Sequence, residues 1–213
     1  MPVSLKDAAS FLREVRFALR YGATPSLPLP SLYQWAGDQR RALEVTNQLL
    51  ESGEGIETNL IAGRLVIAHR EVVPALYALR IRFRARRLSD DAARALSLIC
   101  GGQGVNAGDV RRMLGVEGSQ RPDRADVALG ELMTELLVDR GPASVPATGI
   151  PYLSKEGYPY RAFEEAHRDL VAKARHLTIP KAIAVVVKPL AGVPPRKVAS
   201  MLKLLAHKDE LPR

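Results

Sequence analysis

The densest cluster of charge in the chain is a run of five arginines in eight residues with no acid among them, Arg80-Ile81-Arg82-Phe83-Arg84-Ala85-Arg86-Arg87. In a helix Arg80, Arg84 and Arg87 share one face, and Arg82 and Arg86 lie on another. Guanidinium groups match phosphate oxygens in charge and geometry, so the run is a candidate phosphate-contacting stripe. A solvated linker helix between two domains explains the same residues, and both interpretations remain open.

Four more arginines are candidates for contacts with nucleic acid. Arg111 and Arg112 lie in a predicted short helix within residues 105–115, and Arg121 and Arg124 begin the next one. That next helix also carries four acids, which would repel phosphates if they pointed outward: Asp123, Asp126, Glu131 and Glu135.

The residue types that usually form metal and catalytic sites are scattered. No CxxC or HExxH spacing is present, and His69, His167, His176 and His207 stand far apart, so we predict no metal, no cofactor and no catalytic residue. Gly101-Gly102-Gln103-Gly104 lacks the GKS/T of a phosphate-binding loop and is typical of a helix end. The single cysteine, Cys100, lies in an apolar run and is predicted to be a buried structural thiol.

The formal net charge of +8 indicates a polyanionic partner. The net charge is +5 over residues 1–88, −3 over 89–164 and +6 over 165–213, so the positive charge flanks a mildly acidic middle. No apolar run approaches the length of a membrane span, and the N-terminus has no signal-peptide pattern. We therefore expect a cytoplasmic protein with no membrane association.

The N-terminal region, residues 1–88, is predicted to be helical and winged-helix-like. An amphipathic helix is expected over 4–20, a proline-rich connector over 25–30, a short helix ending at Trp35 and a longer one over 39–52. A strand over 64–68 and a helix over 70–87 follow. Leu29, Leu32 and Trp35 are expected to be buried.

The central region, residues 89–164, is predicted to be a winged helix, with three helices followed by a two-stranded wing that begins at Val138 to Gly141. Its expected core is made of six residues at helical spacing: Leu96, Val110, Leu114, Leu129, Leu132 and Leu136. The C-terminal region, residues 165–213, is predicted to be helical. The first helix is expected over 163–177 and the second over 179–190, and a last helix ends near residue 206. The region resembles the first two helices of a helix-turn-helix and is expected to pack on the rest. The fold class is thus mainly α with small β wings, in a tandem winged-helix or helix-turn-helix architecture.

The order and spacing of four segments resemble the winged-helix relatives of the AlkZ-type DNA glycosylases, enzymes that unhook interstrand crosslinks: 11–17 (FLREVRF), 29–35 (LPSLYQW), 69–79 (HREVVPALYAL) and 158–163 (YPYRAF). The resemblance implies tandem winged helices and a role in DNA metabolism. The active enzymes of that group carry a Gln-x-Gln catalytic pair, and this sequence has none. Catalysis is therefore not carried over.

The sequence thus favours a DNA-binding or DNA-repair-associated module that contacts duplex DNA without sequence specificity. A protein-interaction or homodimerisation scaffold is the first alternative, because a winged helix used for protein contacts has the same pattern. A divergent glycosylase is the second.

Overall fold

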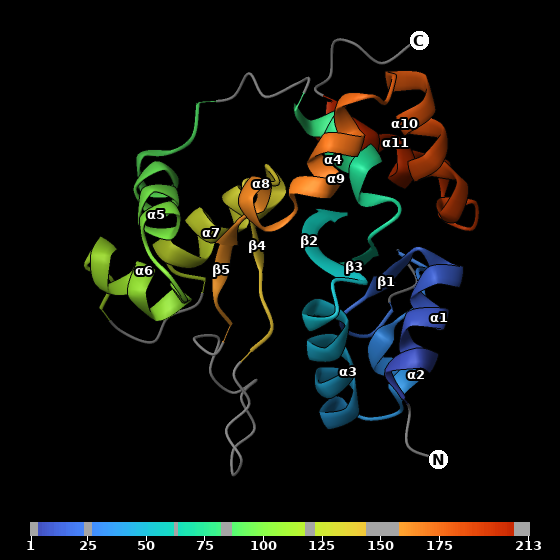
Figure 1. The fold of residues 1–213 in the computed structure, drawn as a ribbon, viewed down its shortest axis with the longest axis horizontal. Helices are drawn as coiled ribbons and strands as arrows, with labels where there is room; N and C mark the ends of the chain where they lie inside the picture. The colour runs from blue at the N-terminus through green and yellow to red at the C-terminus, as the bar shows by residue number, and fades with distance from the viewer. Residues whose placement is uncertain are drawn as a thin grey trace. The chain divides into compact units, whose positions relative to one another are not determined.

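The computed structural model describes residues 4–23, 27–61, 64–81, 87–117, 122–143 and 158–206. It is mainly helical, with two small antiparallel sheets (Figure 1). The chain divides into two compact units. The first unit joins Met1–Arg84 to His167–Arg213, and the second unit is Ala85–Ala166. The C-terminal segment thus groups with the N-terminal one across an intervening unit.

The N-terminal half of the first unit combines three helices with a three-stranded sheet. Strand β3 is the central strand and pairs antiparallel with β1 on one side and with β2 on the other. Side chains from the helices and the sheet share one core, in which Leu12, Leu32 and Ile67 are fully buried. The elements follow one another as α1 (Leu5–Val15), β1 (Phe17–Leu19), α2 (Leu32–Ala36), α3 (Gln39–Glu51), β2 (Gly55–Ile61) and β3 (Arg64–His69).

Each of these helices begins at a side chain that caps it. Ser4 and Asp7 form a reciprocal capping box at α1, and Ser31 accepts a hydrogen bond from the Gln34 N–H at α2. Asp38 accepts one from the Arg41 N–H at α3. An N-cap of this kind stabilises a helix by about 1 kcal/mol, so the starts of the helices are fixed locally.

The helix predicted over 4–20 is wrong beyond Val15. Arg16 has φ 66°, which ends the helix, and Phe17, Ala18 and Leu19 continue as strand β1. All three strand residues are buried, so both faces of β1 are covered, because successive side chains of a strand point to opposite faces. Strand β2 was not predicted either, since its residues lack the apolar–polar alternation of a half-buried strand.

The proline-rich connector docks as predicted, but Trp35 does not. Leu29 and Leu32 are buried, whereas Trp35 is only partly buried and packs at the margin of the core. Its ring stacks on Phe11, with centroids 4.8 Å apart and planes 15° from parallel. Trp35 therefore closes the core from outside instead of filling it.

The rest of the first unit is built around helix α4 (Val73–Ile81), in which every residue from Val73 to Arg80 is buried. Three helices from the C-terminal segment contact it: α9, α10 and α11 (Figure 1). The helix predicted over 163–177 is interrupted at His167, which separates α8 from α9. The C-terminal elements are α8 (Phe163–Ala166, in the second unit), α9 (Arg168–Arg175), α10 (Ile179–Val187), η3 (Lys188–Leu190) and α11 (Pro195–Ala206).

The second unit has the predicted succession of three helices followed by two strands. Helices α5 (Asp90–Gly101), α6 (Ala107–Leu114) and α7 (Arg124–Thr134) precede β4 (Val138–Arg140) and β5 (Tyr160–Ala162), which pair antiparallel. Five of the six predicted core residues are buried, and Leu96 is partly buried.

Gly55, the first residue of β2, provides a test of the first unit's packing. A Cβ there would lie 2.8 Å from Ile67 Cγ2 and 3.1 Å from Leu49 Cβ. We expect Gly55→Ala to lower the free energy of unfolding by about 1–3 kcal/mol, as overpacking of a core does. Urea denaturation measures the change. Gly22→Ala is the matched control, because no atom lies within 4 Å of a Cβ there. Equal stabilities of the two variants would contradict the packing.

Candidate nucleic-acid interface

Arg80, the first residue of the arginine run, is not exposed to solvent. Arg80 is 2% exposed, because the surroundings of α4 enclose it. Arg87 is exposed, and Arg82, Arg84 and Arg86 lie outside the described residues. The structure therefore encloses the guanidinium of Arg80, and the phosphate stripe stays a prediction.

Arg111 is a structural residue of the second unit. Its Nε lies 2.8 Å from Asp123 Oδ2 and its NH2 lies 2.8 Å from Asp126 Oδ1, and the residue is only 6% exposed. This buried bidentate pairing ties α6 to the start of α7. Removing one partner of such a pair strands a buried charge and is strongly destabilising. In this structure the side chain of Arg111 is thus engaged with two carboxylates, and its contact with a phosphate stays a prediction.

The two exposed arginines of the second unit's candidate set are also paired. Arg112 forms an ion pair with Asp109 in the same helix, and Arg124 donates two hydrogen bonds to the Asp91 carboxylate at 2.9 and 2.7 Å. The hydrogen bond from Arg124 lowers the pKa of Asp91. Arg121 lies outside the described residues. These pairs are solvent-accessible, so a phosphate can compete for the guanidinium groups at small cost.

The acids of α7 do not form an outward negative surface. Asp123 caps the helix and, with Asp126, binds Arg111, while the Glu131 carboxylate accepts hydrogen bonds from the Ser89 N–H and hydroxyl. Glu135 is only 7% exposed. The repulsion that the sequence suggested is therefore largely absent.

Arginines of the small sheet are anchored within it. Arg161 pairs with the fully buried Asp139 carboxylate, with NH2 and Oδ2 2.6 Å apart. Arg140 donates to the Tyr160 hydroxyl at 3.0 Å and packs over the rings of Tyr160 and Tyr158. Both arginines thus stabilise the pairing of β4 with β5.

The exposed face of α3 is a site that the sequence analysis missed. The helix buries one side in the first unit's core and presents only polar side chains to solvent: Gln39, Arg40, Arg41, Glu44, Gln48 and Glu51. The Arg40 side chain is 80% exposed and that of Arg41 is 52% exposed. Their ion pairs, with Glu44 at 3.0 Å and with Asp38 at 3.3 Å, lie at the surface and hold the guanidinium groups weakly. Two arginines at the second and third positions after an aspartate N-cap were the available signal.

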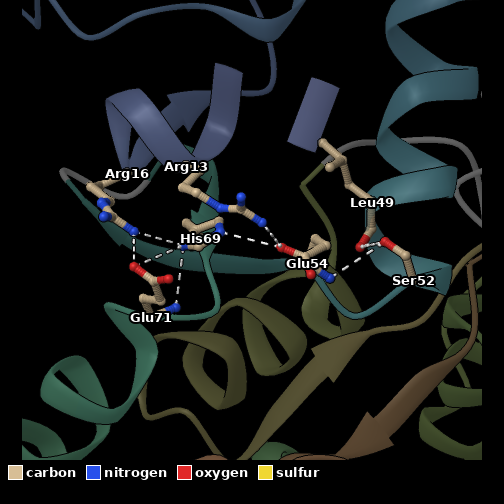
Figure 2. A network of polar contacts seen from close by, with 7 residues as sticks. All are labelled: Arg13, Arg16, Leu49, Ser52, Glu54, His69 and Glu71. Atoms are coloured by element: carbon tan, nitrogen blue, oxygen red, sulfur yellow. Dashed lines mark hydrogen bonds and ion pairs between the residues drawn. The ribbon is translucent and has the colours of Figure 1, made fainter. Parts of the chain in front are cut away.

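Figure 2 shows a second cluster of the first unit, centred on His69, which is 1% exposed. Arg16 NH1 lies 3.0 Å from His69 Nδ1 and also donates to Glu71. On the other side, Glu54 Oε2 lies 3.3 Å from His69 Nε2 and 3.7 Å from Arg13 NH2. The cluster joins the ends of α1 and β3 to the turn before β2.

The partners of His69 define its protonation state. A guanidinium only donates, so Nδ1 is the acceptor and the neutral ring carries its proton on Nε2, towards Glu54. That contact is electrostatic, because Nε2 makes no hydrogen bond. Burial lowers the pKa of His69, and the positive charge of Arg16 lowers it further, against the opposing effects of Glu71 and Glu54.

The His69 cluster contains no activated nucleophile. The nearby Ser52 hydroxyl donates to the Leu49 carbonyl oxygen at 3.2 Å and accepts from the Glu54 N–H, so it is turned towards the backbone. His69 itself is enclosed. The arrangement therefore fits a structural role, in which the cluster links three chain segments, better than general base catalysis.

The remaining chemistry-bearing groups add no site. Within the described ranges, no three metal-ligating side chains gather, and no helix has the length and apolar character needed to cross a bilayer. Cys100 is exposed, which corrects the expectation of a buried thiol. Desolvation raises its pKa, so the thiol is not activated.

The His69 cluster predicts a pH dependence of stability. Because the folded-state pKa of His69 lies below its ordinary value of 6.5, the unfolded chain binds the proton more readily. This contribution to the free energy of unfolding is fully present above pH 6.5 and is lost as the pH falls towards the folded-state pKa. We expect His69→Gln to flatten the decline between pH 8 and about 5.5.

Urea denaturation at a series of pH values measures that decline. His176→Gln is the control, because His176 is exposed, and it should keep the wild-type slope. Parallel curves for the wild type and His69→Gln would contradict the assignment.

The chain was compared with protein-family models, with curated proteins and with solved structures, and none of the three comparisons found a match.

Proposed function

We propose that this protein binds duplex DNA, with the exposed face of α3 entering the major groove. In this proposal the N-terminal half of the first unit is a winged helix, α3 is its recognition helix and the β2–β3 hairpin is its wing. The second unit is a further winged helix, and the chain acts in DNA metabolism, as the resemblance to the crosslink glycosylases suggests.

The order of elements supports the winged-helix proposal. In the first unit the order α1-β1-α2-α3-β2-β3, with β3 central, supplies the helix-turn-helix and the hairpin that such a domain needs. Helices α2 and α3 are separated by Gly37 and Asp38 alone, and Gly37 has φ 87°, as a tight turn between two helices requires. The succession of three helices and two strands supports a second copy in residues 85–166.

The observation that carries the proposal is the composition of the exposed face of α3. Recognition helices contact base edges with residues of their N-terminal turns, and arginine and glutamine are the side chains that read guanine and adenine. Gln39, Arg40 and Arg41 occupy the first turn of α3. Because their ion pairs are local and exposed, binding DNA replaces weak contacts with phosphate or base contacts.

The two alternatives have less support among the described residues. A scaffold needs a contiguous apolar patch, but the exposed large hydrophobic residues are few in the described chain: Tyr21, Tyr33, Ile81, Val127 and Val185. A glycosylase needs a pocket with a carboxylate or glutamine beside an aromatic ring. One pocket of about 70 Å³, between Leu27 and residues of the C-terminal segment, is lined by none of these.

The proposal predicts that the double variant Arg40→Gln/Arg41→Gln binds duplex DNA at least about tenfold more weakly than the wild type. Each arginine that contacts DNA is worth about 1–3 kcal/mol. Fluorescence anisotropy of a labelled mixed-sequence duplex, titrated at several salt concentrations, measures the change. Circular dichroism checks the fold, which exposed substitutions should preserve.

The matched control is Lys6→Gln/Arg13→Gln, which removes two exposed cations from α1 of the same unit. It should change the affinity little. Equal weakening by both double variants would show that only net charge matters and would exclude α3 as the recognition helix.

A further inference from the structure

Helices α9, α10 and α11 and the short η3 turn carry cations that mostly lack an acidic partner. Residues 167–206 contain a single acid, Asp169, which forms ion pairs with Arg70 and Lys173. Six other cations of this segment are exposed and have no ion-pair partner among the described residues: Arg168, Arg175, Lys181, Lys188, Arg196 and Lys197.

Most described arginines in the N-terminal half of the first unit are paired. In its N-terminal half Arg13, Arg16 and Arg20 each pair with a glutamate. Arg40 and Arg41 pair within α3. Like charges gathered in one segment without counterions repel one another, which destabilises the compact state unless a polyanion neutralises them.

The packing of these helices turns the cations outward. Their apolar side chains are buried, among them Leu170, Val186 and Met201, and all three helices contact α4. Arg168 and Arg175 lie seven residues apart in α9, which places them on the same side of that helix. Lys181 of α10 and Lys188, the first residue of η3, are separated by the same interval. The six cations are thus exposed on helices whose other sides pack in the first unit, and together they are called the basic face of these helices.

We propose that this basic face of α9, α10 and α11 is a second binding surface, which takes the phosphate backbone of duplex DNA. The inference rests on the proposed function for its ligand and extends it to a surface remote from α3 in sequence. Phosphate contacts position a protein on DNA without reading sequence, and lysine and arginine suffice for them.

The apolar content of the segment argues for nucleic acid over a lipid surface. A helix that binds a membrane interface inserts an apolar face between the lipids. Here the apolar faces are occupied by packing in the first unit, and the exposed large hydrophobic side chain described in this segment is Val185, at 38% exposure. A rigid polyanion needs no such insertion.

The test uses the full chain with Arg168, Arg175, Lys181 and Lys188 replaced by Gln. Counterion release gives a log–log salt slope of about −0.9 for each neutralised phosphate, so the slope should flatten by up to about 3.6 if all four contact DNA. The control replaces Lys6, Arg13 and Arg94 by Gln, which removes three charges from exposed positions outside the candidate binding residues. It should flatten the slope by less than about one unit. The double variant Lys181→Gln/Lys188→Gln is measured as well, so that a folding failure of the quadruple variant leaves the expectation testable.

Three outcomes would overturn the inference. One is an equal flattening of the slope in the quadruple variant and its control. Another is a wild type that binds vesicles of phosphatidylserine and phosphatidylcholine but no duplex. The third is a wild type that binds neither.

The α3 variant separates this inference from the proposed function. If Arg40→Gln/Arg41→Gln binds as tightly as wild type while the quadruple variant loses its salt slope, the basic face stands and the recognition helix fails. The opposite pattern leaves α3 as the binding site and removes the basic face.

Discussion

The first unit depends on the burial of α4. Every residue of this helix from Val73 to Arg80 is buried, and all of these except Tyr77 and Arg80 are apolar, so the helix can be stable only if other elements cover it on all sides. The cover includes α9, α10 and α11, which come after about eighty intervening residues of the second unit. The N-terminal and C-terminal segments of the chain must therefore fold together. Tyr77, at 1% exposure, is the largest of the side chains that this packing encloses.

The same packing decides which charges can take part in binding. Where a cation lies near an acid of its own unit, the two pair, and burial makes the pair structural, as for Arg20 with the fully buried Glu57, 2.8 Å apart. Arg111 and Arg161 are held in the second unit in the same way. Cations remain available only where acids are absent from the sequence or where pairs are local and exposed. In the described first unit these conditions are met on α9 to α11 and at the start of α3.

Local patterns in the sequence were enough to predict most of the helices. Ser4, Ser31 and Ser89 cap helices whose positions the sequence predicted, and the apolar spacing of residues 90–136 predicted the core of the second unit. The failures have a common cause. Strand β1 is defined by its pairing with residues 66–68, and Arg80 is buried by helices that begin beyond residue 167. A helical periodicity or an arginine run contains no information about partners so far along the chain.

The candidate site was missed for a related reason. Charge density along the sequence is highest at residues 80–87. Binding of a polyanion, however, depends on cations that are exposed and whose ion pairs are weak enough to be replaced. Arg40 and Arg41 are only two residues, but α3 buries its apolar face in a core shared with α1, α2 and β3, and this holds their side chains in solvent. Because α3 and the basic helices belong to one unit, DNA bound at either proposed surface would stabilise the same folded unit by mass action. The proposed binding would therefore be linked to folding of the first unit at both surfaces.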